Sequence, residues 1–229
     1  MTTVLITGAS RGIGAHVARE LADTGATVFA GVRRPEGLTS RLGDSGDLRP
    51  IALDVTDDAS VAAAVSTVEE ITDELDVVIN NAGVAGTWAP AADVVPSDFA
   101  DVLATNLLGP VRVTQAFLPL LRRGTKPRLV MVSSGMGSLT LQGNDSVYAD
   151  IAHLPYPASK AALNMLTVQY AKALPEILVT AVDPGLTATD FTGAVGQTVA
   201  EGAQAVVSTA LDTTRPSGGF VDRYGTTPW

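Results

Sequence analysis

The chain has 229 residues, of which 46% are hydrophobic, and we expect one folded domain over residues 1–229 rather than a disordered chain. It contains no cysteine and only two histidines, which excludes disulfides and cysteine nucleophiles and argues against a metal centre. The formal net charge is −9 with 15 lysines and arginines, so we expect no nucleic-acid partner, because a phosphate backbone needs clustered cations.

Short apolar runs rich in β-branched residues alternate with longer helical stretches along the chain. This alternation is typical of a parallel sheet that is covered by helices on both faces. The predicted strands lie at residues 2–7, 26–32, 49–53, 76–80, 128–133, 177–182 and 219–221, and the predicted helices at residues 12–24, 58–72, 98–122, 156–174 and 199–211. With right-handed crossovers this order predicts an α/β, doubly wound Rossmann fold. It has three α/β/α layers and a seven-stranded, mainly parallel sheet, whose ligand cleft lies at the carboxyl ends of the strands.

The beginning of the chain carries no sign of a targeting segment. Met1 leads almost directly into the first apolar run, without the basic region and small-residue cleavage site of a signal peptide. No apolar run approaches the roughly 18 residues that a membrane span requires. We therefore expect a cytoplasmic protein with no membrane association.

A glycine-rich turn stands between the first strand and the first helix. Its sequence is Thr-Gly-Ala-Ser-Arg-Gly-Ile-Gly, residues 7–14. Glycines let the backbone approach a ligand closely, and the free N–H groups at the start of the helix favour a diphosphate. The alternative is a glycine turn that binds nothing. The residues predicted to contact a nucleotide cofactor here are Gly8, Ser10, Arg11, Gly12, Ile13 and Gly14.

The end of the second strand carries the residues that would distinguish NADP(H) from NAD(H). An acidic side chain there would bind an unmodified ribose, but the chain instead has Arg33 and Arg34, and Arg11 adds a third guanidinium. Guanidinium groups suit a 2′-phosphate, so the sequence predicts NADP(H). In the alternative interpretation, the two arginines are solvated surface charges. Asp54 and Val55, after the third strand, are placed either to close the adenine pocket or to form a turn.

Tyr156 and Lys160 form the pair that carries the predicted chemistry. Residues four apart lie on one face of a helix, so the Lys160 ammonium comes near the Tyr156 phenol. A nearby cation lowers the pKa of a tyrosine and makes its phenol a usable proton donor. Such a pair is rarely expected by chance in a chain with four tyrosines, although a surface pair without a role is the alternative.

Three further polar positions follow strands or interrupt an apolar helix. Ser134 ends the strand at 128–133, where its hydroxyl would bond a substrate oxygen or simply form a turn. Asn106 lies in a helix among apolar residues, where it would kink the helix and bind a water or satisfy a neighbouring backbone group. The fourth strand ends in a turn that either lets the backbone pass close to a cofactor or is a plain turn without a ligand; its residues are Asn81, Ala82 and Gly83.

In their order along the chain, these signals resemble the classical short-chain dehydrogenase/reductase (SDR) family over essentially the whole sequence. The resemblance implies a catalytic tetrad of Asn106, Ser134, Tyr156 and Lys160, and in the family the last two also contact the cofactor. It further implies a nicotinamide-side loop after the sixth strand, with cofactor contacts at Pro184, Gly185, Leu186 and Thr189. From the residues alone, that loop is only a proline-glycine turn.

The function implied by this resemblance is NADPH-dependent reduction of a ketone, aldehyde or quinone to an alcohol. Hydride would pass to the carbonyl carbon while Tyr156 donates a proton to the oxygen that Ser134 holds. Lys160 would bind the nicotinamide ribose, and Asn106 would position a relay water. The alternatives are an alcohol or steroid dehydrogenase that works in the oxidative direction, and a non-catalytic NADP(H)-sensing regulatory protein.

The spacing between Ser134 and Tyr156 is longer than in most classical members. Gly143 occupies the place where the usual spacing puts the serine, so we infer an insertion within residues 138–153. Tyr148 does not replace Tyr156, because Ala152 follows it by four residues. Carbonyl reductases of the family also carry extra residues here, and the ending from 218 to 229 is similar to theirs. The insertion leaves both a monomer and a homo-oligomer open.

The same insertion is expected to border the substrate cleft, because it begins and ends beside the reacting centre. The candidate border residues are otherwise ordinary core or loop residues; they are Trp88, Met136, Leu141, His153, Leu154 and Phe191. An apolar border favours an aromatic or aliphatic carbonyl substrate over a charged sugar.

Overall fold

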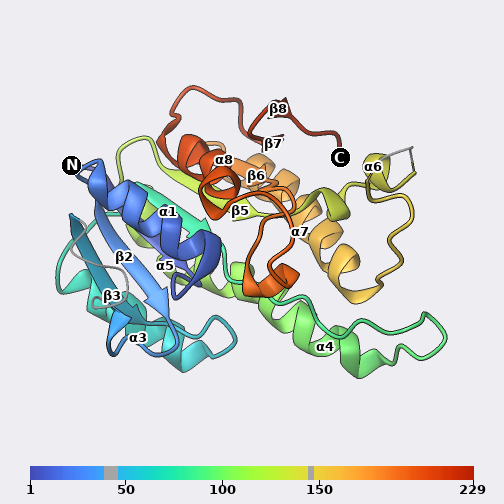
Figure 1. Cartoon of the computed structure of the whole chain (residues 1–229). Helices are drawn as coiled ribbons and strands as arrows, with labels where there is room; N and C mark the ends of the chain where they lie inside the picture. The colour runs from blue at the N-terminus through green and yellow to red at the C-terminus, as the bar shows by residue number, and fades with distance from the viewer. Residues whose placement is uncertain (39–45, 144–146) are drawn as a thin grey trace.

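The computed structural model describes residues 1–38, 46–143 and 147–229, so residues 144–146 of the predicted insertion lie outside the described chain. One sheet lies between two layers of helices (Figure 1). The strands described are β1 (Thr3–Thr7), β2 (Thr27–Val32), β3 (Asp47–Ala52), β4 (Val77–Asn80), β5 (Arg128–Val132), β6 (Leu178–Val182), β7 (Gly219–Asp222) and β8 (Gly225–Thr226). The α-helices described are α1 (Gly12–Asp23), α3 (Asp58–Glu69), α4 (Pro96–Leu103), α5 (Gly109–Arg123), α6 (Leu139–Gly143), α7 (Pro155–Ala173) and α8 (Val199–Leu211).

The order of the strands places the ligand cleft. The sheet runs β3-β2-β1-β4-β5-β6-β7-β8, and every pairing is parallel except that of β7 with β8. The direction of winding reverses between β1 and β4. Ligands of doubly wound sheets bind outside the carboxyl ends of the strands at such a reversal. The predicted Rossmann fold class is thus confirmed, and the glycine turn after β1 stands at this point.

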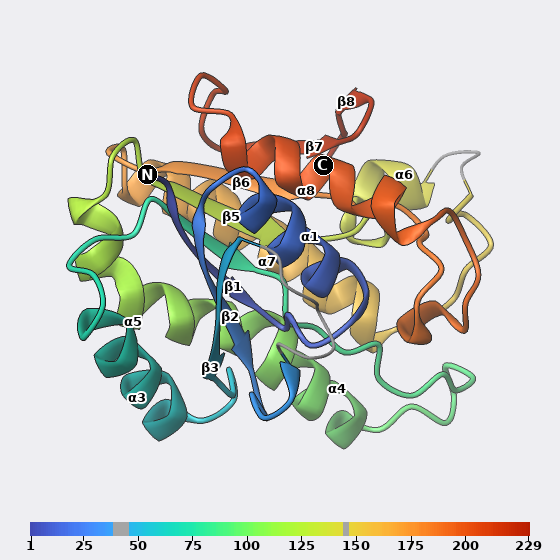
Figure 2. The same ribbon diagram turned by 60° about the vertical axis from the view of Figure 1, so that its left-hand side comes forward.

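Both faces of the central strands are buried, which explains why those strands are continuous apolar runs. In β1, Val4 and Ile6 belong to a core with residues of α1 and α8, whereas Leu5 belongs to a second core with residues of α3, α5 and α7. Figure 2 shows α1 and α8 on one side of the sheet and α3 and α5 on the other. Alternate residues of a strand point to opposite faces, so a strand between two helix layers needs apolar residues at every position.

The predicted helix over 98–122 is wrong as a single helix. The chain instead forms α4, a π-helical turn over Ala104–Leu108, and α5. The side chain of Asn106 in this turn hydrogen-bonds the backbone of Val84, beyond β4. A π turn holds one extra residue and often occurs at functional sites.

The predicted count of seven strands is also one too few, because β8 pairs with β7 in the antiparallel direction. The turn between them is held by Asp222, whose carboxylate accepts hydrogen bonds from the backbone N–H groups of Tyr224 and Gly225 at 2.7 and 2.9 Å. A two-residue strand is too short to show a hydrophobic period.

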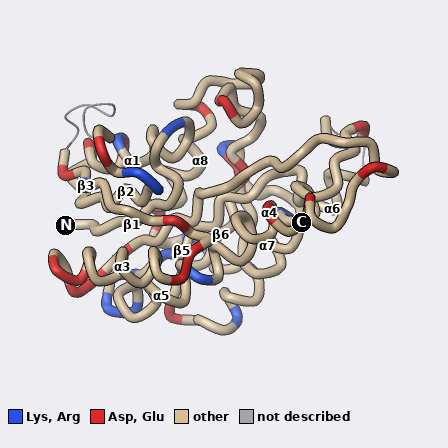
Figure 3. The backbone as a smooth tube through the Cα atoms, turned by 90° about the horizontal axis from the view of Figure 1, so that it is seen from below, with Lys and Arg blue, Asp and Glu red and all other residues tan. Residues whose placement is uncertain are grey.

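Within the described ranges, no helix combines the length and the apolar character needed to cross a membrane. Figure 3 shows lysines and arginines at several separate places on the chain, with acidic residues beside them.

Candidate active site

The glycine turn forms a cradle that side chains would fill. Gly8 and Gly12 have φ angles of +69° and +55°, in the left-handed region that favours glycine. A Cβ atom at Gly14 would lie 2.5 Å from the Gly8 carbonyl oxygen and closer still to the side-chain nitrogen of Asn81. That nitrogen donates a hydrogen bond to the Thr7 carbonyl at 2.9 Å. The turn therefore brings bare backbone to the N-terminus of α1, which suits a diphosphate.

Gly14→Ala is expected to lower the free energy of unfolding by about 1–3 kcal/mol and to weaken NADPH binding, because the new methyl group pushes Gly8 and Asn81 out of place. Chemical denaturation and a fluorescence titration with NADPH measure the two effects. Gly143→Ala is the matched control, since among the described residues no atom outside its own helix and chain neighbours lies within 4 Å of its added Cβ. Alanine is a better helix former than glycine, so without close packing the substitution would stabilise α1. A Gly14→Ala protein that is more stable and binds NADPH normally would therefore contradict the close packing.

A cavity of about 830 Å³ extends from this turn along the carboxyl ends of the strands, within the size range of cofactor and ligand pockets. Most of the predicted cofactor residues line it. From the glycine turn to the loop after β6 they are Gly8, Ser10, Arg11, Gly12, Ile13, Gly14, Arg33, Asp54, Val55, Asn81, Ala82, Gly83, Tyr156, Lys160, Pro184, Gly185, Leu186 and Thr189. Arg34 is exposed and does not line the cavity.

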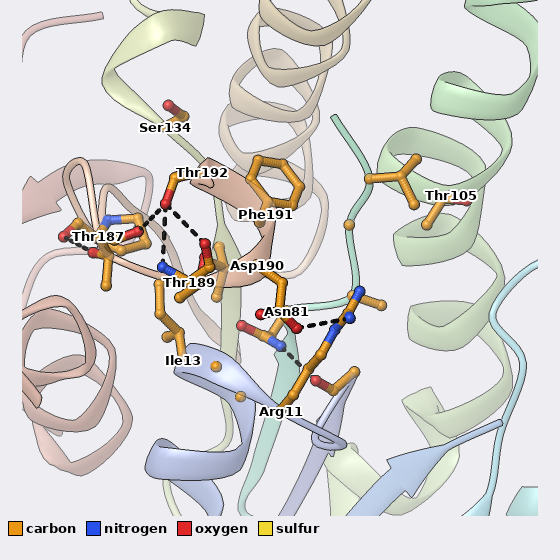
Figure 4. A pocket seen from close by; sticks show the side chains of 18 of the residues that line it. Arg11, Ile13, Asn81, Thr105, Ser134, Thr187, Thr189, Asp190, Phe191 and Thr192 are labelled. Atoms are coloured by element: carbon orange, nitrogen blue, oxygen red, sulfur yellow. Dashed lines mark hydrogen bonds and ion pairs between the residues drawn. The ribbon is translucent and has the colours of Figure 1, made fainter. Parts of the chain in front are cut away.

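At one end of the cavity Arg33 lies near Asp54, whose carboxyl pKa is lowered chiefly by hydrogen bonds from Thr56 and also by the Arg33 charge. The Asp54 carboxylate accepts from the backbone and hydroxyl of Thr56 at 2.9 and 2.7 Å. Asp54 therefore both forms a turn and lines the cavity. The third guanidinium, that of Arg11, makes an exposed ion pair with Asp190 at 2.9 Å (Figure 4).

The loop after β6 is held against the glycine turn. A Cβ atom at Gly12 would lie 3.3 Å from the Thr189 methyl carbon, so the two segments are in contact. The Thr192 hydroxyl donates to the Thr187 carbonyl at 2.5 Å and accepts from the Thr189 backbone N–H at 3.1 Å (Figure 4). Gln197 donates to the Pro184 carbonyl at 2.6 Å. These bonds fix the loop at the mid-point of the cavity.

Tyr156, Lys160 and Ser134 lie together at the inner wall of the cavity. Tyr156 lies in the first turn of α7, and the Lys160 nitrogen is 5.6 Å from the centre of its ring. The Lys160 ammonium also donates to the Val132 carbonyl at 2.8 Å. Ser134 also lines the cavity, and its hydroxyl lies close enough to Tyr156 to favour the phenolate form. The helical spacing thus brings the pair together as predicted, and the end of β5 supplies the serine.

The electrostatics of this group differ from the sequence-based expectation that Lys160 lowers the pKa of Tyr156. Burial raises the pKa of Tyr156 above its ordinary value, and the Ser134 hydroxyl works in the opposite direction. Burial also lowers the pKa of Lys160 to about 8, while the charge of Asp183 opposes this shift. Desolvation dominates both shifts, because Lys160 is buried and Tyr156 is half-buried at the cavity wall.

Asn106 is fully buried and does not line the cavity. Its oxygen accepts from the Val84 N–H at 2.9 Å, and its nitrogen donates to the Val84 carbonyl at 2.9 Å and to the Ser159 hydroxyl at 3.0 Å. A Cβ atom at Gly83 would lie 3.4 Å from the Asn106 oxygen and 3.8 Å from the Lys160 nitrogen. Asn106 therefore joins the end of β4, the π turn and α7 behind the cavity wall.

Only some of the residues that were predicted to border the substrate cleft lie at the cavity. Met136 and Phe191 line the cavity, and Phe191 packs against Tyr156 with ring centres 5.5 Å apart. His153 stacks on Trp88 at 4.0 Å and lies 6.3 Å from Tyr156. Leu141 and Leu154 do not line the cavity.

Two further residues of the cavity wall were not predicted to have a role. Asp183 directly follows β6 and is buried, and Tyr148 lies in the turn before α7. A Cβ atom at Gly135 would lie 2.7 Å from the Tyr148 oxygen and 2.8 Å from an Asp183 oxygen, so the two side chains approach each other beside Gly135. The only sequence signal for Asp183 is its place at the end of a strand, and none distinguishes Tyr148 within the insertion.

Comparison with known proteins agrees with this geometry. The short chain dehydrogenase family matches residues 2–200. The chain is 37% identical over 223 residues to short-chain dehydrogenase anuI of Penicillium roqueforti, covering 91% of this chain and 88% of that protein. Its fold is similar to that of NADPH-bound carbonyl reductase from chicken fatty liver, with a TM-score of 0.87, 30% identity and coverage of 100% and 99%. Carbonyl reductase Sniffer of D. melanogaster gives a TM-score of 0.84 at 26% identity, with both chains covered fully.

The chain belongs to the short-chain dehydrogenase/reductase family, and its relatives include carbonyl reductases. It is an oxidoreductase that uses a cofactor of the NAD(P) type, and the bare-backbone cradle of the glycine turn fits such a cofactor.

Proposed function

We propose that this protein is an NADPH-dependent reductase that converts a ketone, aldehyde or quinone to an alcohol. The observation that carries the proposal is the Tyr156 phenol. It lies beside Ser134 at the wall of a cavity that the glycine turn and the loop after β6 also line. A half-buried phenol with a raised pKa keeps its proton at neutral pH, as a proton donor must. The NADPH-bound chicken carbonyl reductase supports the same assignment.

The cofactor would lie along the cavity from Arg33 to the loop after β6. The backbone N–H groups of the glycine turn and the N-terminus of α1 would bind the diphosphate, and Arg33 the 2′-phosphate. Leu186 and Thr189 would orient the carboxamide, and Lys160 would bind the nicotinamide ribose. When bound, NADPH supplies the hydride. Arg34 has no place in this arrangement, because its side chain is exposed outside the cavity.

The residues of the chain then position the carbonyl and supply the proton. The Ser134 hydroxyl would hold the carbonyl oxygen, and the Tyr156 phenol would donate its proton to that oxygen while the carbon receives the hydride. Asn106 does not line the cavity, so we assign it the indirect role of fixing the π turn against Val84 and Ser159, and its expected contact with a relay water stays a prediction. Hydride transfer to the carbon and proton transfer to the oxygen together would give the product alcohol.

The substrate end of the cavity is aromatic and apolar, with Phe191 packed on Tyr156 and Trp88 stacked on His153 beyond it. Trp88 is 60% exposed, so one face of its indole remains accessible. We therefore expect apolar carbonyl compounds of several shapes to react, and charged sugars to react poorly.

Loss of nicotinamide absorbance with NADPH, and with NADH in parallel, across ketones, aldehydes and quinones tests this proposal. Turnover with NADPH on several apolar substrates is expected. Assays of the corresponding alcohols with NADP⁺ measure the reaction in the oxidative direction. If no carbonyl compound reacts although NADPH binds tightly, or if only alcohol oxidation with NAD⁺ is detected, the proposal is wrong.

A further inference from the structure

Ser134 stands where the chain leaves the sheet, so the strands alone do not fix its side chain. β5 ends at Val132, and the Ser133 N–H still donates to the Val182 carbonyl of β6 at 2.7 Å. A single 3₁₀ turn over Gly135–Gly137 follows the serine directly. The place of the Ser134 hydroxyl therefore depends on what holds the chain on either side of it.

Asn164, on α7, holds this segment at two points. The Ser133 hydroxyl donates to the Asn164 side-chain oxygen at 2.5 Å, and the Asn164 side-chain nitrogen donates to the Gly137 carbonyl at 3.1 Å. The two partners stand one residue before and three residues after Ser134, so a single amide brackets the serine. Asn164 is 4% exposed and does not line the cavity, so any effect that it has on the reaction passes through the segment that it holds.

The two partners of Asn164 need an amide. A hydroxyl proton needs an acceptor and a carbonyl oxygen needs a donor, and the asparagine side chain presents one of each on a short, planar group. An aspartate would offer no donor to the Gly137 carbonyl, and a leucine would fill a similar space with neither group. Ser133 and Gly137 are both buried, where an unpaired polar group is costly.

The 3₁₀ turn also packs tightly on the helix that carries the tyrosine. A Cβ atom at Gly137 would lie 2.6 Å from the Lys160 carbonyl carbon and 2.7 Å from the Lys160 Cβ. Residues 156, 160 and 164 follow one another at four-residue intervals, so they lie along one face of α7. One helix thus presents the Tyr156 phenol to the cavity and, two turns later, the amide to the serine segment.

The turn sets the direction of the serine hydroxyl. The Met136 N–H donates to the Ser134 hydroxyl oxygen at 3.2 Å, and the Gly137 N–H donates to the Ser134 carbonyl at 2.9 Å. The first bond uses a lone pair of the hydroxyl oxygen, so the hydroxyl proton can still be donated to an oxygen in the cavity. A turn that shifts or opens would move this hydroxyl, because both bonds are made within the turn.

We propose that Asn164 is a positioning residue that holds Ser134 at the cavity wall by bonding the chain on both sides of it. The catalytic consequence rests on the proposed function, in which Ser134 binds the carbonyl oxygen. Misplacement of a reacting group by about 1 Å can cost about 100-fold in rate. Loss of the bracket therefore slows the chemical step, whereas NADPH keeps its affinity, because its proposed contacts lie outside residues 133–137.

Asn164→Leu tests the proposal, because it keeps a similar side-chain volume and removes both bonds. We expect kcat for carbonyl reduction to fall by about tenfold or more, with a nearly unchanged Kd for NADPH. Amide hydrogen exchange of residues 133–138, measured by mass spectrometry, should become faster in this variant, and that measurement needs no turnover. Ser133→Ala removes only one of the two bonds and provides a milder second variant if the leucine protein folds poorly.

A double-mutant comparison separates positioning from general destabilisation. In a Ser134→Ala background, Asn164→Leu should cause little further loss of kcat, because the group that it positions is gone. A merely structural role would lower kcat by the same factor in both backgrounds.

Thr167→Val is the matched control. Thr167 is buried on the same helix, and its hydroxyl donates to the Leu163 carbonyl of α7 itself at 3.0 Å. The variant therefore removes a buried hydrogen bond without touching the serine segment. Both kcat and the exchange of residues 133–138 should match those of the unaltered protein.

Unchanged exchange of the serine segment, or full kcat, in the folded Asn164→Leu and Ser133→Ala proteins would overturn the inference. An equal loss of kcat from Asn164→Leu with and without the Ser134 hydroxyl would overturn it as well. Faster exchange in Asn164→Leu, when the unaltered protein reduces no carbonyl compound, would support the bracket around Ser134 and contradict the reductase assignment.

Discussion

Tyr156→Phe is expected to lower kcat for carbonyl reduction by about 10³-fold and to leave the Kd for NADPH nearly unchanged. The substitution removes one hydroxyl group and keeps the ring that packs against Phe191. The variant therefore lacks the group that we propose as proton donor to the carbonyl oxygen. Steady-state kinetics and a fluorescence titration with NADPH measure the two quantities.

Tyr170→Phe is the matched control, because Tyr170 lies on the same helix, packs against the core beneath the sheet and does not line the cavity. It should retain full activity. A Tyr156→Phe protein with more than a tenth of normal kcat would show that another group supplies the proton. If the affinity for NADPH falls by as large a factor as kcat does, the hydroxyl mainly shapes the cofactor site.

Much of the fold follows from the sequence because its signals are local. A strand buried on both faces needs apolar residues at every position, so β1 is visible as a continuous run. The glycine turn is equally local, since it directly joins β1 to α1. The break at Ala104–Leu108 is different: Asn106 bonds Val84, which is 22 residues away, and a helical period cannot reveal that contact.

The candidate site likewise combines contacts that are local in the sequence with contacts between distant segments. Tyr156 and Lys160 are one helical turn apart, so their proximity is a property of the helix itself. Tyr148 and Asp183 meet only because the turn before α7 and the end of β6 converge on Gly135. Burial likewise could not be predicted from the spacing of the pair, and it is burial that raises the pKa of Tyr156 where a neighbouring cation was expected to lower it. The catalytic roles themselves stay predictions until the variants are measured.

Arg33 and Arg34 show a further limit of sequence reasoning. Both arginines lie just beyond β2, where the alternation of a strand no longer fixes which way each side chain points. The sequence therefore does not reveal which one faces the cofactor. In the structure Arg33 lines the cavity beside Asp54, and Arg34 lies outside it. The sequence predicted the same role in cofactor binding for both arginines, and the structure now predicts that role for Arg33 alone.

Arg33→Ala is therefore expected to lower the ratio of kcat/KM with NADPH to kcat/KM with NADH by about 10- to 100-fold, the equivalent of one charge-assisted bond of roughly 1.5–3 kcal/mol. The loss should fall on NADPH alone, because NADH has no 2′-phosphate for the guanidinium to bind. Arg34→Ala is the matched control, and it removes the same charge from the neighbouring position outside the cavity. The two variants change the net charge equally, so any general electrostatic effect on an anionic cofactor is common to both. If this ratio changes little and equally in the two variants, both arginines are solvated surface charges. If it changes more in Arg34→Ala than in Arg33→Ala, Arg34 binds the 2′-phosphate and the assignment to Arg33 is wrong.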